Sequence, residues 1–280
     1  MGSLAAARVQ ASGFSLRVLS RDRRPLQRQL HWPDGRSLFL NMAAAGDEPV
    51  RRLIVAVKAG DTAAALQSLS ARWSDDVDIL RLQNGMGSLD GVTLPAAARV
   101  LHLVSTDGAW RDGEHVHVVA ENRTLIGDGS DQPPHWFAAL AAHWPGLRWC
   151  PDIERAQWQK LSVNAVINPL TALYRCRNGE LLDGGQRQQR MAVLAQEADQ
   201  LLQQLYPDWP ADTLERSRLV AQQTAANTSS MLADVLAGRR TELRYINGYL
   251  LRRARELGLH LPAHARLLTE LGEAPMVAAP

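Results

Sequence analysis

The chain has 280 residues, of which 46% are hydrophobic and 21% charged, and its formal net charge is +2. This composition is typical of a soluble globular protein with room for two domains of ordinary size. The near-neutral charge gives no reason to expect nucleic acid or an anionic membrane as a partner, and no apolar run reaches the roughly 18 residues of a membrane span.

In the first half of the chain, short β-like runs alternate with helical stretches. A small-residue helix that ends at Gly13 comes first. We expect strands at residues 16–19, 53–57, 77–82 and 99–104, and a helix at residues 61–73. Alternating strands and helices are typical of a parallel α/β sheet. Residues 116–120 and 123–126 are then expected to pair as an antiparallel hairpin over Glu121 and Asn122.

Long helical patterns dominate from residue 153 onward. The expected helices span residues 154–175, 186–205, 213–237 and 241–257. We therefore predict an α/β fold with a Rossmann-like, dinucleotide-binding sheet domain over residues 1–152 and an all-helical domain over residues 153–280.

The sequence predicts neither a targeting segment nor a metal site. The first 13 residues lack the basic flank, apolar core and cleavage site of a signal peptide. Cys150 and Cys176 are the two cysteines, and we expect them to be free thiols in a reducing cytoplasm. The eight histidines show none of the spacings that metal coordination requires.

The start of the chain resembles the second half of a βαβ unit. In a dinucleotide-binding fold, a strand and a G-x-G-x-x-G turn precede such a helix, and Gly2 stands where the third glycine belongs. The first strand and the two earlier glycines do not occur in this sequence. We hypothesise that Met1 is internal to a product that starts roughly ten residues earlier, and that the chain as written binds its cofactor poorly. An ordinary N-terminal helix is the simpler interpretation.

Arg21 ends the second strand of this unit. An acidic residue at this place accepts hydrogen bonds from the ribose of NAD, whereas the planar guanidinium of an arginine suits a 2′-phosphate. Arg21 therefore favours NADP(H), with Arg23 and Arg24 adding positive potential. A shift of one residue would place Asp22 there and restore the NAD interpretation, and a solvated basic loop is the alternative without a ligand.

Two further segments follow strands directly. Lys58 comes after residues 53–57, and Gln83-Asn84-Gly85-Met86-Gly87 comes after residues 77–82. In an open parallel sheet, ligands bind at the carboxyl ends of the strands, and glycines let the backbone approach a ligand closely. Asn84 offers both a donor and an acceptor. A glycine turn that starts a helix would explain the same residues without a ligand.

The run from Lys160 to Thr171 carries the most information. Lys160, Asn164 and Asn168 recur every four residues and so share one helical face, in a helix that is otherwise apolar. Buried polar groups need partners, and a cavity with a polar ligand would supply them. Hydrogen bonds to other helices are the alternative. Pro169 removes one helical hydrogen bond and is expected to kink the helix.

A last group of polar residues lies in the C-terminal half of the chain. Ser229 and Ser230 form part of it, and Thr241-Glu242 has the pattern of a helix start, with glutamate favoured near the positive end of the helix dipole. A purely structural role would therefore also explain Glu242 and the two serines.

Together, these segments resemble the ketopantoate reductase family over nearly the whole chain. The most specific parts are residues 82–87, 160–173 and 229–248. The resemblance implies an NADPH-dependent oxidoreductase that reduces ketopantoate, also called 2-dehydropantoate, to pantoate in the biosynthesis of pantothenate and coenzyme A. It also implies a small 2-oxo acid as the only partner besides the cofactor, with a homodimer left open.

The resemblance assigns roles by motif. It implies Lys160 as the general acid and Glu242 as the partner of the substrate hydroxyl. The other implied site residues are Asn164, Asn168, Ser230 and Asn84 for the substrate, and Gly2, Arg21, Lys58 and Asn84 for the cofactor. Two departures from the family pattern are the absent first strand and the acidic run Thr106-Asp107-Gly108, which puts local cofactor contacts in doubt.

Two alternatives stay open at this point. One is a reductase of another 2-oxo acid, because the motifs specify the reaction better than the side-chain pocket. The other is a ligand-binding protein with impaired catalysis, which the absent glycine turn would explain.

Overall fold

The structure, a computed structural model, describes residues 1–272 and divides into two compact units. The first unit contains residues 1–83 and 91–156, and the second contains residues 84–90 and the chain from Gln157 on. The chain therefore leaves the first unit after Gln83, contributes a short loop to the second, and returns at Gly91.

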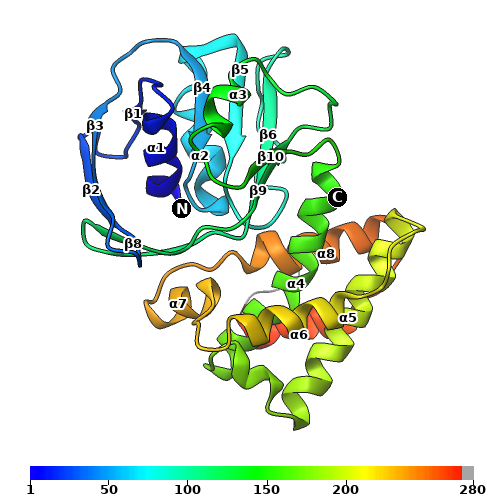
Figure 1. The fold of residues 1–280 in the computed structure, drawn as a ribbon. Coiled ribbons are helices and arrows are strands. Elements are labelled where there is room, and N and C mark those ends of the chain that lie inside the picture. Colours follow the sequence, from blue (N-terminus) through cyan, green and yellow to red (C-terminus); the bar gives the residue numbers. More distant parts are fainter. Residues whose placement is uncertain (273–280) are drawn as a thin grey trace. The chain divides into compact units, whose positions relative to one another are not determined.

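Two five-stranded sheets form the first unit (Figure 1). One sheet has the order β1-β3-β2-β8-β7, with strands β1 (Arg17–Val18), β2 (Leu26–His31), β3 (Ser37–Ala44), β7 (Gly108–Asp112) and β8 (His115–Ala120). The other has the order β10-β9-β6-β5-β4, with strands β4 (Val50–Val55), β5 (Trp73–Arg81), β6 (Arg99–Ser105), β9 (Thr124–Gly127) and β10 (Leu147–Trp149). The predicted α/β class is confirmed, but antiparallel pairs make both sheets mixed.

The small-residue helix at the start of the chain is confirmed as α1 (Gly2–Ala11), which lies between the two sheets (Figure 1). Ala5 and Val9 pack into the core of the sheet that contains β5 and β6, while Leu4 packs into the core of the other sheet. Small side chains let one helix serve both cores, because they keep its axis close to both sheets. Gly13, at φ +78°, ends this segment.

The expected hairpin between residues 116–120 and 123–126 is wrong. Both strands exist, but β8 pairs with β7 and β2, whereas β9 pairs with β6 and β10, in the other sheet. Glu121 and Asn122 therefore belong to a crossing between sheets and not to a tight turn. The carboxylate of Glu121 forms ion pairs with Arg8 of α1 and with Arg36, which anchors the crossing segment.

The acidic run after β6 serves the same crossing. The carboxylate of Asp107 accepts a hydrogen bond from the backbone N–H of Asn122 at 2.6 Å and another from the hydroxyl of Thr124 at 3.2 Å. The side-chain amide of Asn122 in turn donates to the carbonyl of Thr106 at 3.0 Å. Asp107 therefore has a structural role, which explains its departure from the expected pattern.

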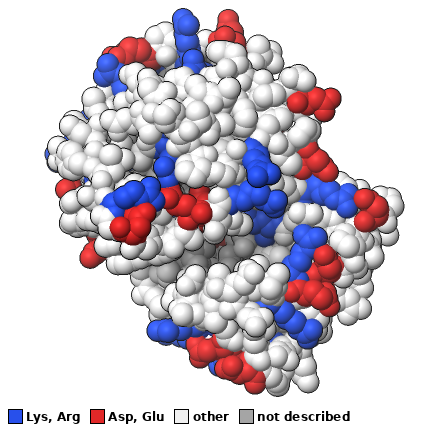
Figure 2. Space-filling model, in the orientation of Figure 1, with Lys and Arg blue, Asp and Glu red and all other residues white. Residues whose placement is uncertain are grey.

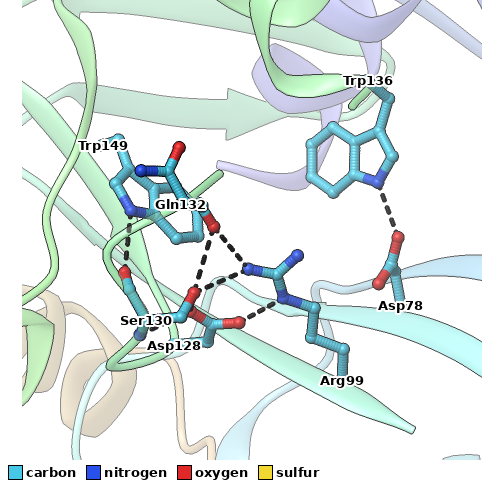
Figure 3. A network of polar contacts seen from close by, with 7 residues as sticks. All are labelled: Asp78, Arg99, Asp128, Ser130, Gln132, Trp136 and Trp149. Carbon is cyan, nitrogen blue, oxygen red and sulfur yellow. Dashed lines mark hydrogen bonds and ion pairs between the residues drawn. The ribbon is translucent and has the colours of Figure 1, made fainter. Parts of the chain in front are cut away.

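A polar network closes the amino end of β6 (Figure 3). Arg99, the first residue of β6, forms an ion pair with Asp128 and donates to Ser130 Oγ at 2.9 Å. Trp149 of β10 donates from Nε1 to the carbonyl of Ser130 at 3.0 Å, and its ring lies 5.5 Å from the Arg99 guanidinium carbon. Because β4, β5 and β6 are parallel, this network lies at the edge opposite to the carboxyl ends of the strands.

The first unit contains two more helices, α2 (Thr62–Gln67) and α3 (Phe137–Ala141). The helix expected at residues 61–73 is thus shorter than predicted, because the chain turns into β5 at Trp73. The helices that follow are α4 (Ile153–Tyr174), α5 (Gly185–Leu205), α6 (Thr213–Gln223), α7 (Ser230–Leu236), α8 (Leu243–Glu256) and α9 (Pro262–Glu270). The single helix expected over residues 213–237 is wrong, because α6 ends at Gln223 and α7 begins after Ser229.

Helix α5 provides N-terminal caps for two other helices. Glu197 accepts hydrogen bonds from the backbone N–H groups of Ala263 (2.7 Å) and His264 (3.0 Å) at the start of α9. Asp199 accepts from the hydroxyl and the backbone N–H of Thr213, at 2.5 and 3.3 Å, at the start of α6. Burial raises the pKa of both carboxyl groups. The residues before α6 and α9 provide no side-chain cap of their own, so α5 satisfies their free N–H groups.

Acidification should destabilise the protein through His264. Its imidazole is 0% exposed, and burial lowers its pKa from 6.5 to about 4. Between these two values the unfolded chain binds a proton that the folded chain does not, so stability falls as the pH is lowered through this range. We expect this group to lower the free energy of unfolding by about 2 kcal/mol between pH 7 and pH 5, measured by urea unfolding.

The control for this prediction is His264→Gln, which removes the titrating group. Its free energy of unfolding should depend less steeply on pH than that of the unaltered protein. His102, whose pKa burial also lowers to about 4, contributes equally to both proteins. The same pH dependence in both would contradict the assignment to His264.

The surface carries charges of both signs. On the face that Figure 2 shows, Lys and Arg side chains are interspersed with Asp and Glu, in keeping with the net charge of +2. None of the helices within residues 1–272 combines the length and apolar character that crossing a membrane requires. Both cysteines are free, as expected.

Candidate functional site

Three predicted site residues share a face of α4. Lys160 and Asn164 are partly exposed and Asn168 is 8% exposed, while their neighbours Leu161 and Ala165 are buried in the core of the helical unit. The side-chain amides of Asn164 and Asn168 form no hydrogen bond with another residue in the described part of the chain, so these donors and acceptors are available to a ligand.

The two serines before α7 have different roles. Ser229 is 6% exposed and caps α7, because its Oγ accepts a hydrogen bond from the backbone N–H of Leu232 at 3.1 Å. The same oxygen lies 2.6 Å from Oγ1 of Thr171 on α4. Ser230, the first residue of α7, is exposed. The structural interpretation of Ser229 is thus confirmed, while the predicted role of Ser230 in substrate binding stays a prediction.

Glu242 precedes the first residue of α8, so the predicted helix start is confirmed. Its carboxylate does not cap the helix. The hydroxyl of Thr241 instead accepts a hydrogen bond from the backbone N–H of Leu243 at 3.3 Å. The side chain of Glu242 is partly exposed and stands at the positive end of the α8 dipole, so the structural interpretation still applies to it, and its predicted role toward a substrate stays a prediction.

The loop of residues 84–90 belongs to the helical unit and packs on α8. The backbone N–H of Met86 donates to the carbonyl of Tyr245 at 2.8 Å. Gly85 has φ +75°, and a Cβ there would overlap the same carbonyl. Gly87 has φ +79°, and a Cβ there would lie 2.7 Å from the ring of Tyr249. These glycines permit close contact with a helix, while the expectation that they approach a ligand stays a prediction. The alternative of a glycine turn that starts a helix is wrong, because no helix starts at them.

The candidate residues of the helical unit lie on segments joined by three hydrogen bonds. These are Met86 N to Tyr245 O (2.8 Å), Asn247 Nδ2 to Ala165 O (2.8 Å), and the pair Thr171 Oγ1 and Ser229 Oγ (2.6 Å). They connect the loop 84–90 to α8, α8 to α4, and α4 to α7. The segments so connected carry Asn84, Glu242, Lys160, Asn164, Asn168 and Ser230.

Lys58 follows β4 in the first unit, as predicted. Its carbonyl accepts the backbone N–H of Asp61 at 2.9 Å, which begins the turn into α2. Thr62, the first residue of α2, accepts a hydrogen bond from Gln83 Nε2 at 2.6 Å. Since Gln83 follows β5, this bond ties together the carboxyl ends of two parallel strands.

Gly2 and Arg21 occupy different places in the first unit. Gly2 begins α1, and a Cβ there would lie 2.8 Å from Cβ of Ala56, directly after β4. The close helix–strand packing inferred for Gly2 is therefore present. Arg21 is exposed in a turn that follows β1, in which Ser20 Oγ accepts the backbone N–H of Arg24 at 3.2 Å.

Asn247 is the polar residue that we did not single out in the sequence. It is 0% exposed on α8, among the buried residues Leu243, Ile246 and Leu250. An asparagine on the apolar face of a helix was a signal that could have found it, because a buried amide needs a partner. Pro169 was a second signal, because its missing N–H leaves a carbonyl of α4 in need of a donor.

Two family models match the chain. The model described as "Ketopantoate reductase PanE/ApbA" matches residues 1–131, and "Ketopantoate reductase PanE/ApbA C terminal" matches residues 152–274. A 2-dehydropantoate 2-reductase of Yersinia pestis is 40% identical over 219 residues, which cover 77% of this chain and 71% of the relative. One of Archaeoglobus fulgidus is 30% identical over 279 residues, which cover 96% and 92%.

Solved structures are similar in fold. A PanE/ApbA family ketopantoate reductase from Ralstonia eutropha JMP134 superimposes with a TM-score of 0.84 at 21% identity, over 95% of this chain and 92% of that chain. A D-mandelate dehydrogenase, in a ternary structure with NADH and anilino(oxo)acetate, has a TM-score of 0.82 at 16% identity, over 97% and 94%.

Proposed function

Since the chain belongs to the ketopantoate reductase family, we propose that it is an oxidoreductase that reduces ketopantoate to pantoate with NADPH. The observation that carries this proposal is the set of three hydrogen bonds that connects the loop 84–90, α8, α4 and α7 in the helical unit. It joins the segments that bear an amine, a carboxylate and three amides, the groups that recognition and protonation of a 2-oxo acid require.

The residues of the first unit fit a dinucleotide. The first turn of α1 contains no acidic residue, so its free N–H groups and positive dipole end suit a phosphate. Gly2 keeps this helix end against the residues that follow β4, close in sequence to Lys58. Arg21 would hold the 2′-phosphate, and Lys58 would bind on the cofactor side.

The proposed chemistry follows the movement of charge. NADPH supplies the hydride that reduces the ketone carbon. Negative charge then develops on the ketone oxygen, where the ammonium of Lys160 stabilises it and donates a proton. The carboxylate of Glu242 binds the hydroxyl group of the substrate and so orients the substrate, and its negative charge balances the positive charge of Lys160. The amides of Asn164 and Asn168, with Asn84 and Ser230, hold the substrate in line.

The use of lysine in this chain supports the role of Lys160. Of its 31 basic residues, only Lys58 and Lys160 are lysines. An arginine keeps its proton under all conditions that a protein tolerates, whereas a lysine amine can release one and take it back. A chain that uses arginine at nearly every other basic position has a lysine at the position where proton transfer is proposed.

The experiment that tests the function is a reduction assay on a panel of 2-oxo acids, followed as the oxidation of NADPH. With NADPH, ketopantoate should give the highest kcat/KM, and pyruvate, 2-oxoisovalerate and phenylpyruvate should give lower values. A higher value with another 2-oxo acid would assign the protein to a different reductase. Absence of NADPH oxidation with every acid, at NADPH concentrations that saturate the protein, would overturn the proposed activity.

Cofactor choice gives a second test. In Arg21→Ala, the Kd for NADPH should rise, while the Kd for NADH should barely change, because only NADPH carries the 2′-phosphate. Isothermal titration with both cofactors measures the difference. Arg218→Ala, which removes an exposed arginine of α6, should leave both values unchanged. If the unaltered protein prefers NADH, Asp22 is the determinant and the assignment of Arg21 fails.

A further inference from the structure

Helix α4 continues through Pro169 without a break. Proline has no backbone N–H, so the carbonyl of Ala165, four residues earlier, has no partner within its own helix. The side chain of Asn247 replaces the missing donor. Its Nδ2 lies 2.8 Å from the Ala165 oxygen, and the residue is 0% exposed.

The orientation of Asn247 is set from its other side. The ring of His264 lies with Nε2 3.0 Å from the carbonyl of Leu194, which can only accept a hydrogen bond, so Nε2 carries the proton. In the neutral ring Nδ1 is then an acceptor, and it lies 2.9 Å from Nδ2 of Asn247. Both N–H bonds of the amide are thus in use, one toward α4 and one toward α9.

The amide oxygen of Asn247 makes no such contribution. It is buried and has no hydrogen-bond partner among the described residues. An unsatisfied buried acceptor is costly, so the side chain is useful for its two donors and not for its carbonyl.

The position of this bond connects it to the candidate site. Ala165 lies between Asn164 and Asn168 on α4, directly after Asn164, which is one turn from Lys160. Asn247 lies in the second turn of α8, which begins directly after Glu242. The bond therefore joins the helix of the proposed acid to the helix of the proposed carboxylate, at the level of the substrate-binding amides.

We propose that Asn247 is a positioning residue for the reduction: by replacing the N–H that Pro169 lacks, it holds the Lys160 face of α4 in register with Glu242 on α8. This inference rests on the proposed function. Without the bond, α4 can pivot at Pro169, where its hydrogen-bond ladder is interrupted. Small misplacements of this kind reduce turnover strongly, because the acid must meet the ketone oxygen in a narrow range of geometry.

The test is a cycle of three variants: Asn247→Leu, Pro169→Ala and the double substitution. Alanine at position 169 restores an N–H that can bond to Ala165 within the helix, so it should make Asn247 dispensable. In urea unfolding, Asn247→Leu should lower the midpoint clearly in the unaltered background and less in the Pro169→Ala background. This measurement needs neither substrate nor cofactor.

Turnover provides the readout that distinguishes positioning from stability alone. At a temperature where the variant is folded, Asn247→Leu should lower kcat by about 10- to 100-fold and leave the KM for NADPH nearly unchanged. The double variant should recover most of this loss. Rescue by a substitution that restores a hydrogen bond in another helix would not follow from a general loss of packing.

Asn178→Leu is the matched control. Asn178 is 7% exposed, donates from Nδ2 to Oγ1 of Thr224 at 2.8 Å, and also has a buried amide oxygen without a partner among the described residues. It does not join α4 to α8. Its replacement should lower the urea midpoint and leave kcat unchanged.

Three results have distinct meanings. Unchanged kcat in folded Asn247→Leu, or equal losses of midpoint in both backgrounds, would overturn the positioning role. A loss of kcat without rescue in the double variant would overturn the compensation for Pro169. If the unaltered protein reduces no 2-oxo acid, the proposed function fails, while the unfolding cycle still decides whether Asn247 compensates for Pro169.

Discussion

Replacing Lys160 with alanine should lower kcat by about 10²- to 10⁴-fold and leave the KM for NADPH nearly unchanged. The proton that the ketone oxygen receives would then have to come from water. The side chain does not belong to the buried core, so the variant should fold. Steady-state kinetics with ketopantoate and NADPH, together with a urea unfolding curve, measure both quantities.

Two further variants separate the charge of Lys160 from its proton. Lys160→Arg keeps a cation but not an acid that can release its proton, so it should improve the KM for ketopantoate relative to Lys160→Ala while kcat stays low. Lys58→Ala, at the other lysine of the chain, should raise the KM for NADPH and affect kcat less. Near-normal kcat in Lys160→Ala would remove this residue from the mechanism.

The second large effect is expected from Gly85→Ala. The new Cβ would overlap the carbonyl of Tyr245, and φ at this position is +75°. Overpacking of this kind costs about 1–3 kcal/mol, and left-handed backbone costs a further 1–2 kcal/mol or so. The loop 84–90 should therefore move away from α8 and take Asn84 with it. We expect kcat/KM to fall by about 10²-fold, measured with ketopantoate and NADPH.

Gly91→Ala is the control for the contact itself. Gly91 has φ +74°, so the backbone strain is the same, but a Cβ there meets nothing within 4 Å. The difference between the two variants in free energy of unfolding and in kcat/KM then reports the contact with α8. If both variants behave alike, the strain alone explains the effect, and the packing of the loop does not position Asn84.

The long helices were predictable from the sequence because their signal is local. Helices α4 and α5 match the expected ranges within a residue or two, because the apolar residues of each follow helical spacing from end to end. The interruption between α6 and α7 was missed, although Ser229 has the side chain of an N-cap, because the apolar pattern continues on both sides of it.

Strand pairing was less predictable. The alternating pattern of residues 116–120 correctly indicates a strand, but period alone does not say which strand lies beside it. β8 pairs with the preceding strand β7 and with β2, and not with the following strand β9. The crossing from β8 to β9 is stabilised by the ion pairs of Glu121 and the hydrogen bonds of Asp107. These contacts join residues far apart in the chain, which a local pattern does not contain.

In the candidate site, too, the local pattern was predictable and the long-range contact was not. The common face of Lys160, Asn164 and Asn168 follows from helical spacing and is confirmed in α4. That the loop 84–90 packs on α8 was not predictable, because Gly85 fits a ligand and the carbonyl of a helix equally well. Only the fold shows which of the two lies against it.

The capping of α6 and α9 by α5 has a consequence for how the helical unit opens. Helix ends normally fray, so their first amide hydrogens exchange with solvent quickly. Here the amides of Thr213, Ala263 and His264 are bonded to carboxylates on α5, which is buried along much of its length. Their exchange therefore requires the start of α6 or α9 to separate from α5, so protection at these amides reports how often each helix leaves α5 and not the fraying of an isolated helix end.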